Sequence, residues 1–227
     1  MSKQRANLPF DTNHFSRLVN SKEKLSVKDT FLYIYQNNHW NAESSKSGAG
    51  SDNIQTEAIK RELPGLIEKF NIKTMLDLPC GDFNWLNNVT LNLQSYIGGD
   101  IVKEIIDTNI KLYQNPNRRF LELNIITDTL PDSDLLFCRD CLVHFSNEDI
   151  VKTLNNIKNN KTRYFCATSF INCEVNNNIT TGDWRIINLT KSPFLLPEPI
   201  FIINEKCTEG EGTYNDKSLC LWKVEDL

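Results

Sequence analysis

The stretch "KTMLDLPCGDFNWL" (residues 73–86) decides the fold class. Its first half, residues 73–78, is a short apolar run that predicts a buried strand. The acidic residue Asp77 stands at the end of this run, and Pro79 and Gly81 follow it as turn-forming residues. In an open α/β sheet, ligands bind at the carboxyl ends of the strands, so this turn is the first place to look for a site.

The pattern of this stretch is repeated along the chain. Amphipathic segments that predict helices, at 102–113 and 146–159, separate further near-continuous apolar runs. Such runs between helices indicate a mostly parallel sheet with helices on both faces, the doubly wound, Rossmann-like α/β class. The further predicted strands are 95–101, 118–125, 134–139, 163–170, 200–207 and 217–224.

The N-terminal part of the chain has a different texture. Residues 1–50 are polar and irregular apart from an aromatic-rich helical stretch, and we expect them to form a helical lid or extension. Residues 51–227 form the main predicted domain, in one globular unit overall. It begins with a helix capped by Ser51, which Pro64 should bend or interrupt.

Composition narrows the class of partner. The chain of 227 residues has a net charge of −4 and no long Lys/Arg run, which disfavours nucleic acid. No apolar run approaches the ~20 residues of a membrane span, and the N-terminus has no apolar signal region. The seven cysteines form an odd, scattered set. We therefore expect a cytoplasmic protein with reduced thiols.

Polar residues follow four of the predicted strands in order. Asp77 follows the first, Asp100 the second, Asn124 the third and Arg139 the fourth. One extended ligand crossing the sheet edge would contact all four positions. An acidic residue at position 100 can accept hydrogen bonds from a ribose diol, although the preceding Gly-Gly pair is equally typical of an ordinary turn.

The first of these turns separates two kinds of cofactor. A diphosphate-binding turn has the pattern G-x-G-x-x-G, whereas only Gly81 is present here. The carboxylates of Asp77 and Asp82 would repel a diphosphate but suit an ammonium and a sulfonium group. The turn therefore favours S-adenosylmethionine (SAM) over NAD.

Four segments together resemble motifs I to IV of the class I SAM-dependent methyltransferases: "TMLDLPCGDFNWL", "YIGGDI", "FLELNII" and "LLFCRDCLVHF". A closer likeness, over roughly residues 40–224, is to small bacterial methyltransferases found with surface-polysaccharide and secondary-metabolite genes. That group's pattern includes "SGAGSDNIQT", "GDWRIINLTKSPF" and "DKSLCLW". Pro79 departs from the general class, which usually has a glycine there.

The resemblance implies a seven-stranded sheet with the last strand antiparallel, SAM as cofactor and S-adenosylhomocysteine (SAH) as product. It places Asp77 and Gly81 near the methionine part and Asp100 on the ribose. Other cofactor contacts that it implies are Pro79, Ile101, Asn124, Ile125 and Arg139, with Asn124 and Ile125 near the adenine. Gly50 and Ser51 would cover the mouth of the cofactor or substrate site, or form a simple flexible entry to the helix.

The acceptor side has its own candidate residues. Arg139, Asp140 and His144 follow the fourth strand, and a helical turn there would place Asp140 and His144 on one face. An aspartate can fix a histidine tautomer, so His144, oriented by Asp140, is the candidate general base. The alternative is a histidine that only closes a turn before the helix at Ser146.

A second loop supplies possible acceptor-binding residues. Trp184, Arg185 and Asn188 combine an aromatic surface with hydrogen-bonding groups, a mixture suited to polar small molecules. Trp40 is a further candidate from the N-terminal segment. Packing in the core explains Trp184 and Trp40 equally well.

The predicted function is therefore methyl transfer to an oxygen or nitrogen of a small polar acceptor, with a sugar or glycan precursor favoured. A short peptide or other natural product, and a catalytically silent SAM-binding partner subunit, are the alternatives. A zinc site on Cys138 and Cys141 is disfavoured because no second C-x2-C pair exists, and we expect no metal. The oligomeric state carries no signal in the sequence.

Overall fold

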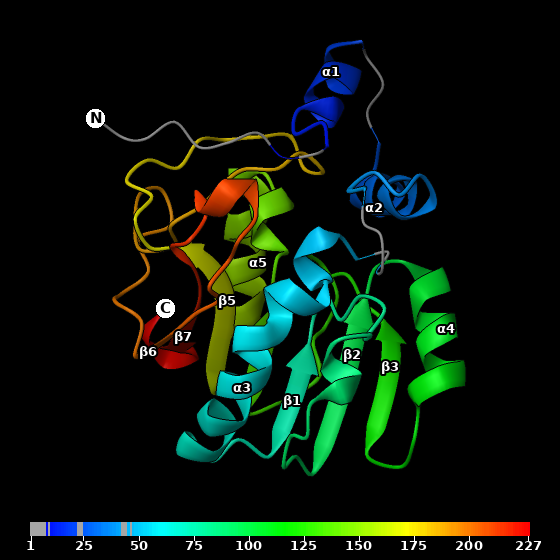
Figure 1. Cartoon of the computed structure of the whole chain (residues 1–227), viewed down its shortest axis with the longest axis vertical. Coiled ribbons are helices and arrows are strands. Elements are labelled where there is room, and N and C mark those ends of the chain that lie inside the picture. The colour runs from blue at the N-terminus through cyan, green and yellow to red at the C-terminus, as the bar shows by residue number, and fades with distance from the viewer. Residues whose placement is uncertain (1–7, 9, 22–24, 42–44, 46) are drawn as a thin grey trace.

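A seven-stranded sheet forms the centre of the computed structural model, which describes residues 8, 10–21, 25–41, 45 and 47–227. The strand order is β3-β2-β1-β4-β5-β7-β6 (Figure 1). The strands are β1 (Thr74–Asp77), β2 (Ser95–Asp100), β3 (Arg118–Glu122), β4 (Leu135–Cys138), β5 (Tyr164–Phe170), β6 (Phe201–Asn204) and β7 (Lys217–Lys223). This order confirms the doubly wound α/β class.

The direction of the last strand also agrees with expectation. Strands β1 to β5 pair in parallel, whereas β7 is antiparallel to both of its neighbours, β5 and β6. The strand order reverses between β1 and β4, which are hydrogen-bonded neighbours. The carboxyl ends of these two strands therefore form the topological switch point, where such sheets bind ligands.

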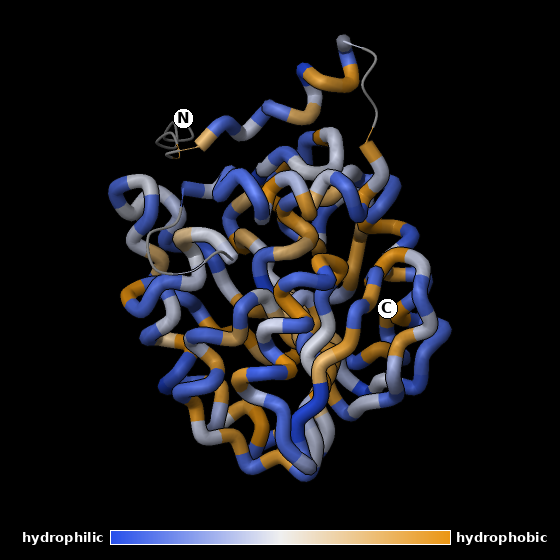
Figure 2. Tube along the Cα trace, turned by 90° about the vertical axis from the view of Figure 1, so that its right-hand side faces the viewer, coloured by the Kyte–Doolittle hydropathy of each residue, from blue (hydrophilic) through white to orange (hydrophobic). Residues whose placement is uncertain are grey.

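Helices cover both faces of the sheet (Figure 1). Helices α3 (Asn53–Lys69) and α4 (Lys103–Tyr113) pack on one face, and α5 (Asn147–Lys158) packs on the other. Successive residues of a strand point to opposite faces, so Met75 joins the core under α3 while Leu76 joins the core under α5. Figure 2 shows hydrophobic stretches of the chain, in orange, running through the middle of the molecule.

The N-terminal segment lies over the carboxyl end of the sheet (Figure 1). It contains α1 (His14–Asn20) and α2 (Val27–Gln36), whose N-cap Ser26 accepts a hydrogen bond from the N–H of Asp29. Phe31 of α2 packs against the core that α5 covers. The described part of this segment thus covers the switch point.

One local prediction about the helices was wrong, one is confirmed, and an interruption at Pro64 does not occur. Asp52, rather than Ser51, is the N-cap of α3, because Ser51 belongs to a preceding short 3-10 turn (Ala49–Ser51). Pro64 lies inside α3 without ending it. Ser146 caps α5 as predicted, with its hydroxyl accepting the N–H of Asp149 at 3.1 Å.

Among the residues that the structure describes, none of the helices is both long and apolar enough to cross a bilayer.

Candidate active site

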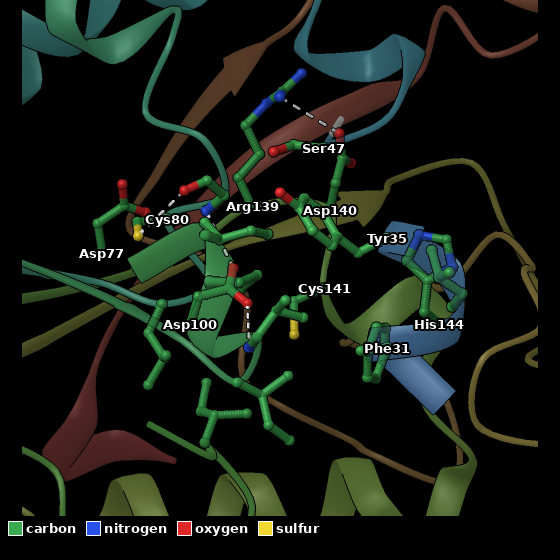
Figure 3. A pocket seen from close by; sticks show the side chains of 18 of the residues that line it. Phe31, Tyr35, Ser47, Asp77, Cys80, Asp100, Arg139, Asp140, Cys141 and His144 are labelled. Atoms are coloured by element: carbon green, nitrogen blue, oxygen red, sulfur yellow. Dashed lines mark hydrogen bonds and ion pairs between the residues drawn. The ribbon is translucent and has the colours of Figure 1, made fainter. Parts of the chain in front are cut away.

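A cavity opens at the carboxyl ends of β1, β2 and β4, beneath α2. This main cavity, counted together with the open solvent at its mouth, has a volume of about 970 Å³. In Figure 3, Asp77 and Asp100 lie on one side, His144 and Phe31 on the other, with Asp140 between them. The main cavity therefore brings together residues that are far apart in the sequence.

Asp100 ends β2 and is fixed by main-chain groups. Its Oδ1 accepts the N–H of Val102 at 2.9 Å, and its Oδ2 accepts the N–H of Gly81 at 3.2 Å. Burial raises the pKa of this carboxyl group to about 6, against these hydrogen bonds, which lower it. Each carboxylate oxygen can accept more than one hydrogen bond, so both can still serve a ligand diol in the cavity.

Asp77 ends β1 and also lines the main cavity. Its Oδ2 accepts the hydroxyl of Tyr96 at 2.6 Å. Burial raises the pKa of Asp77 to about 7, although the Tyr96 hydrogen bond lowers it. The side chain is 4% exposed, so an ionised Asp77 needs a nearby positive charge to offset its desolvation.

The turn after β1 is held in a conformation that suits glycine. Gly81 has a φ of +54°, and its carbonyl oxygen accepts the side-chain amide of Asn109 at 2.7 Å. A Cβ atom at Gly81 would lie 2.3 Å from the Ser47 hydroxyl. Gly81 is therefore required both for the backbone conformation and for the close approach of the segment above it.

The residues 47–51, here called the glycine loop, lie against this turn. The Ser47 hydroxyl accepts the N–H of Asp82 at 2.9 Å, and the carbonyl oxygen of Gly50 accepts Nη2 of Arg139 at 2.7 Å. Ser51 lines the main cavity. The glycine loop is therefore part of the wall of the cavity, with Gly50 facing the second pocket described below.

The remaining predicted cofactor residues also lie at the main cavity. Ile101 and Asn124 follow β2 and β3, and Ile125 is 4% exposed beside them. The main cavity is lined by every residue predicted to contact a cofactor except Gly50: Asp77, Pro79, Gly81, Asp100, Ile101, Asn124, Ile125, Arg139 and Ser51.

Arg139 and Asp140 follow β4 and belong to a buried ion-pair network. Nη2 of Arg139 lies 2.8 Å from Oε2 of Glu205, and Nζ of Lys217 lies 2.7 Å from Oδ2 of Asp140. Burial disfavours the charge of Asp140, but Lys217 and Arg139 outweigh it and hold its pKa well below the usual range. Asp140 therefore stays ionised at neutral pH.

His144 ends a 3-10 turn (Leu142–His144) and lies at the far wall of the main cavity. Its Nδ1 is 3.1 Å from the carbonyl oxygen of Asp183, and its ring stacks on Trp40 with centroids 4.5 Å apart. A carbonyl oxygen only accepts, so Nδ1 carries the hydrogen and Nε2 is the proton-accepting nitrogen. Burial lowers the pKa of His144 to about 4.

The predicted orientation of His144 by Asp140 was wrong. The side-chain partners of the Asp140 carboxylate are Lys217, Arg139 and Thr168, while the main chain of Asp183 holds Nδ1 of His144. Asp140 has a left-handed backbone, with a φ of +51°, so the two residues do not share a helical face. Both nevertheless line the main cavity.

A second pocket adjoins the main cavity, and Trp40, Ser47, Asp140 and His144 line both. The lining of the second pocket includes both aromatic and charged residues. Trp184 lies here, with its ring centroid 5.4 Å from that of Tyr214. The aromatic members are Phe10, Trp40, Phe170, Trp184 and Tyr214, and the charged members are Asp140, Glu209 and Lys217.

Two predicted acceptor-binding residues line neither space. The guanidinium of Arg185 donates to the carbonyl oxygens of Leu142 and Phe145, both at 2.7 Å. The amide of Asn188 donates to the carbonyl oxygens of Ile171 and Cys173 at 3.2 and 3.1 Å. Both side chains hold neighbouring loops together, which corrects the prediction that they bind the acceptor.

Sequence reasoning missed three charged residues of the site, Lys217, Glu205 and Glu209. Lys217 stands in the segment "DKSLCLW", which was recognised as a pattern but given no chemical role. Across the described ranges, no three His, Cys, Asp or Glu side chains cluster as metal ligands. Cys138 and Cys141 are both buried free thiols.

No protein-family model and no curated protein matches the chain. Solved structures do match. Human N-acetylserotonin methyltransferase in complex with SAM is 11% identical, with a TM-score of 0.59 over 93% of this chain and 62% of that one. The N-methyltransferase NodS from Bradyrhizobium japonicum is 9% identical, with a TM-score of 0.56 over 76% of this chain and 97% of that one.

The methyltransferase domain of bacterial CtHen1 also matches, at 11% identity and a TM-score of 0.45 over 51% of this chain. The chain spans 66% of the length of that domain and 62% of the length of the human structure. The likenesses to the human enzyme and to NodS show that the chain has the fold of class I methyltransferases.

Proposed function

We propose that the chain is a SAM-dependent methyltransferase that acts on an oxygen or nitrogen of a small polar acceptor. The observation that carries this proposal is the main cavity, in which Asp77 and Asp100 face one space at the switch point of a methyltransferase fold. The likeness to a human methyltransferase solved with SAM supports the choice of cofactor.

The residues of the main cavity fit SAM. The Asp100 carboxylate stands where it can accept hydrogen bonds from a ribose diol, and Ile101 and Ile125 offer apolar contacts for the adenine. Asp77 is buried and its ionised form needs a positive charge, which the ammonium of the methionine part would supply. Gly81, Asn124 and Ser51 are the further contacts that we propose.

Bound there, SAM would supply an activated methyl group, whose transfer to the acceptor breaks the methyl–sulfur bond and leaves SAH. The protein must align the acceptor and take the proton of its hydroxyl or amine. Nε2 of His144 is the proton acceptor that we propose, because the Asp183 carbonyl fixes the hydrogen on Nδ1. The low pKa of His144 keeps this nitrogen unprotonated at neutral pH.

The second pocket is the proposed acceptor site. It meets the main cavity at Asp140 and His144, and its Trp184 and Tyr214 rings offer surfaces for a ring-shaped molecule. A sugar or glycan precursor is the favoured acceptor, since its apolar face packs on aromatic rings while its hydroxyls bond charged groups. A short peptide or another natural product is the alternative.

Two further proposals concern the chain as a whole. The N-terminal residues 1–50 act as a lid, because Phe31, Tyr35 and Trp40 line the main cavity from above. Residues 1–7, 9, 22–24, 42–44 and 46 of that predicted segment lie outside the described residues. All seven cysteines are free thiols, which supports a reducing compartment, the cytoplasm.

Isothermal titration with SAM and SAH tests the proposal. We expect both to bind at micromolar or lower dissociation constants with one site per chain. The Asp107→Asn variant should bind both molecules as the wild type does, because Asp107 is an exposed aspartate of α4 paired with Lys103. The absence of binding by both molecules would refute the proposed function.

A further inference from the structure

Four charged side chains meet beneath the glycine loop. Arg139 and Asp140 follow β4, Glu205 follows β6, and Lys217 begins β7. Nζ of Lys217 lies 2.7 Å from Oδ2 of Asp140 and 3.5 Å from Oε2 of Glu205. Arg139 contacts the same two carboxylates, at 3.4 Å for Asp140 and 2.8 Å for Glu205. Two cations thus share these two anions, and Nζ of Lys217 also lies 3.9 Å from Oε2 of a third carboxylate, Glu209.

The members of this network differ in exposure. The side chains of Arg139 and Lys217 are 5% exposed and that of Glu205 is 1% exposed, whereas that of Asp140 is 26% exposed. Asp140 is also the carboxylate that lines both the main cavity and the second pocket. The network therefore presents one anion to the boundary between the two spaces.

The Asp140 carboxylate has little freedom to turn. The Thr168 hydroxyl accepts the N–H of Asp140 at 2.8 Å and donates to its Oδ1 at 3.3 Å. On the other side, a Cβ atom at Gly50 would lie 2.8 Å from Oδ2, so the glycine loop closes over the carboxylate. Lys217 completes the enclosure through its own contact to Oδ2.

The charged residues of the second pocket affect which acceptor groups can approach Asp140. Among the residues that the structure describes, two carboxylates, Asp140 and Glu209, and one ammonium, Lys217, line it. Nζ of Lys217 is within 4 Å of three carboxylates, those of Asp140, Glu205 and Glu209. Such a lining favours an acceptor that donates hydrogen bonds over one that carries an anionic group at the reacting end.

We propose that Lys217 is a positioning residue that holds the Asp140 carboxylate at the boundary of the two spaces, where it receives a hydrogen bond from the hydroxyl or amine of the acceptor. The enzyme would thereby select acceptors that bear such a donor beside the reacting atom and reject those with a phosphate or carboxylate there. This inference rests on the proposed function. Lys217 acts through Asp140 and not on the acceptor itself.

Sinefungin tests the position of the carboxylate without knowledge of the acceptor. It is a SAM analogue with an ammonium on carbon in place of the methylsulfonium, whereas SAH has a neutral sulfur there. The ratio of the dissociation constants of SAH and sinefungin therefore reports the anion at the transfer position. We expect the wild type to bind sinefungin roughly tenfold more tightly, and Asp140→Asn to lose most of that preference.

The variant Lys217→Met distinguishes positioning from simple charge balance. If Lys217 only neutralises charge, removing its ammonium increases the preference for the cationic ligand. If it positions Asp140, the preference falls roughly three- to tenfold, with SAH affinity little changed because Lys217 does not line the main cavity. Lys223→Met, at an exposed lysine of the same strand, is the matched control.

A double variant keeps the test valid if the Lys217→Met protein does not fold. Lys217→Met with Glu205→Gln removes one charge of each sign, so the buried network stays balanced, and the same loss of preference is expected. An unchanged or increased preference in either variant would overturn the role of Lys217 while leaving SAH binding intact. If wild-type protein binds neither SAH nor sinefungin, the proposed function fails and this inference fails with it.

Discussion

Nδ1 of His144 lies 3.1 Å from the main-chain oxygen of Asp183, so a main-chain group in a distant loop fixes the tautomer of this histidine. The carboxylate of the same Asp183 accepts the N–H groups of Phe15 and Ser16 at the start of α1, at 2.7 and 3.1 Å. One residue therefore holds both the candidate base and the N-terminal segment above it.

The first prediction concerns the protonation of His144. Burial lowers its pKa to about 4, so the ring should be neutral, with the hydrogen on Nδ1, throughout pH 5–8. Nitrogen-15 NMR of histidine-labelled protein measures both properties, and the chain has only three histidines to assign. His14→Gln and His39→Gln variants provide the assignment. A midpoint near 6.5, or a hydrogen on Nε2, would contradict the assigned role.

The same shift predicts how stability depends on pH. The unfolded histidine has a pKa near 6.5, so between pH 6.5 and 4 the unfolded state binds the extra proton. The contribution of His144 is therefore a loss of stability as pH falls through this window, and none above it. In chemical denaturation at pH 5 and pH 8, His144→Phe should reduce this difference in unfolding free energy, and an unchanged difference would argue against a buried neutral ring.

The contribution of Asp77 to stability should have the opposite dependence on pH. Its pKa is raised to about 7, so between pH 3.8 and 7 the folded state holds the extra proton and stability falls as pH rises. Asp77→Asn keeps an acceptor for Tyr96 and removes the charge. We expect it to stabilise the apo protein at pH 8, by up to ~4 kcal/mol, and much less at pH 4.5. It should also weaken SAM binding. Equal melting shifts at both pH values would contradict the burial argument.

Asp100 should matter for binding more than for folding. Replacement by asparagine leaves one oxygen where two now accept the N–H groups of Gly81 and Val102. We expect the dissociation constant of SAH to rise roughly tenfold or more, because a charged acceptor of the ribose diol is lost. Titration of Asp100→Asn beside the Asp107→Asn control measures this effect. Unchanged affinity would remove Asp100 from the proposed ribose contact.

Arg185 and Trp184 are neighbours with different expected roles. Arg185→Met leaves the carbonyl oxygens of Leu142 and Phe145 without their donor, and we expect it to lower the unfolding free energy by roughly 2–4 kcal/mol. Arg61→Met, at an exposed arginine, should lower the free energy of unfolding only slightly. Arg185→Met protein of wild-type stability would contradict the structural assignment.

Trp184→Phe should change acceptor binding in the second pocket more than stability.

The sequence predicted the fold, and it predicted most of the residues that line the main cavity, because both depend on local patterns. Asp77 and Asp100 stand at strand ends, and parallel strands bring their carboxyl ends to one edge whatever the loops do. The acceptor side was harder. Lys217 reaches Asp140 because β7 lies antiparallel between β5 and β6, a long-range relationship that no local pattern encodes.

Local geometry explains the other errors. The prediction that Asp140 orients His144 assumed a helical spacing, but the left-handed backbone at Asp140 breaks it. Arg185 carries the same charge whether it binds a ligand or a carbonyl oxygen, so only the surrounding main chain reveals its role. The cap of α3 was misplaced by one residue because Ser51 and Asp52 are both good caps.

A crystal structure of the SAH complex tests the central claim most directly. The account predicts SAH in the main cavity, with its ribose hydroxyls on the Asp100 carboxylate and its sulfur facing the boundary formed by Asp140 and His144. SAH bound elsewhere, or a ribose that makes no contact with Asp100, would contradict it.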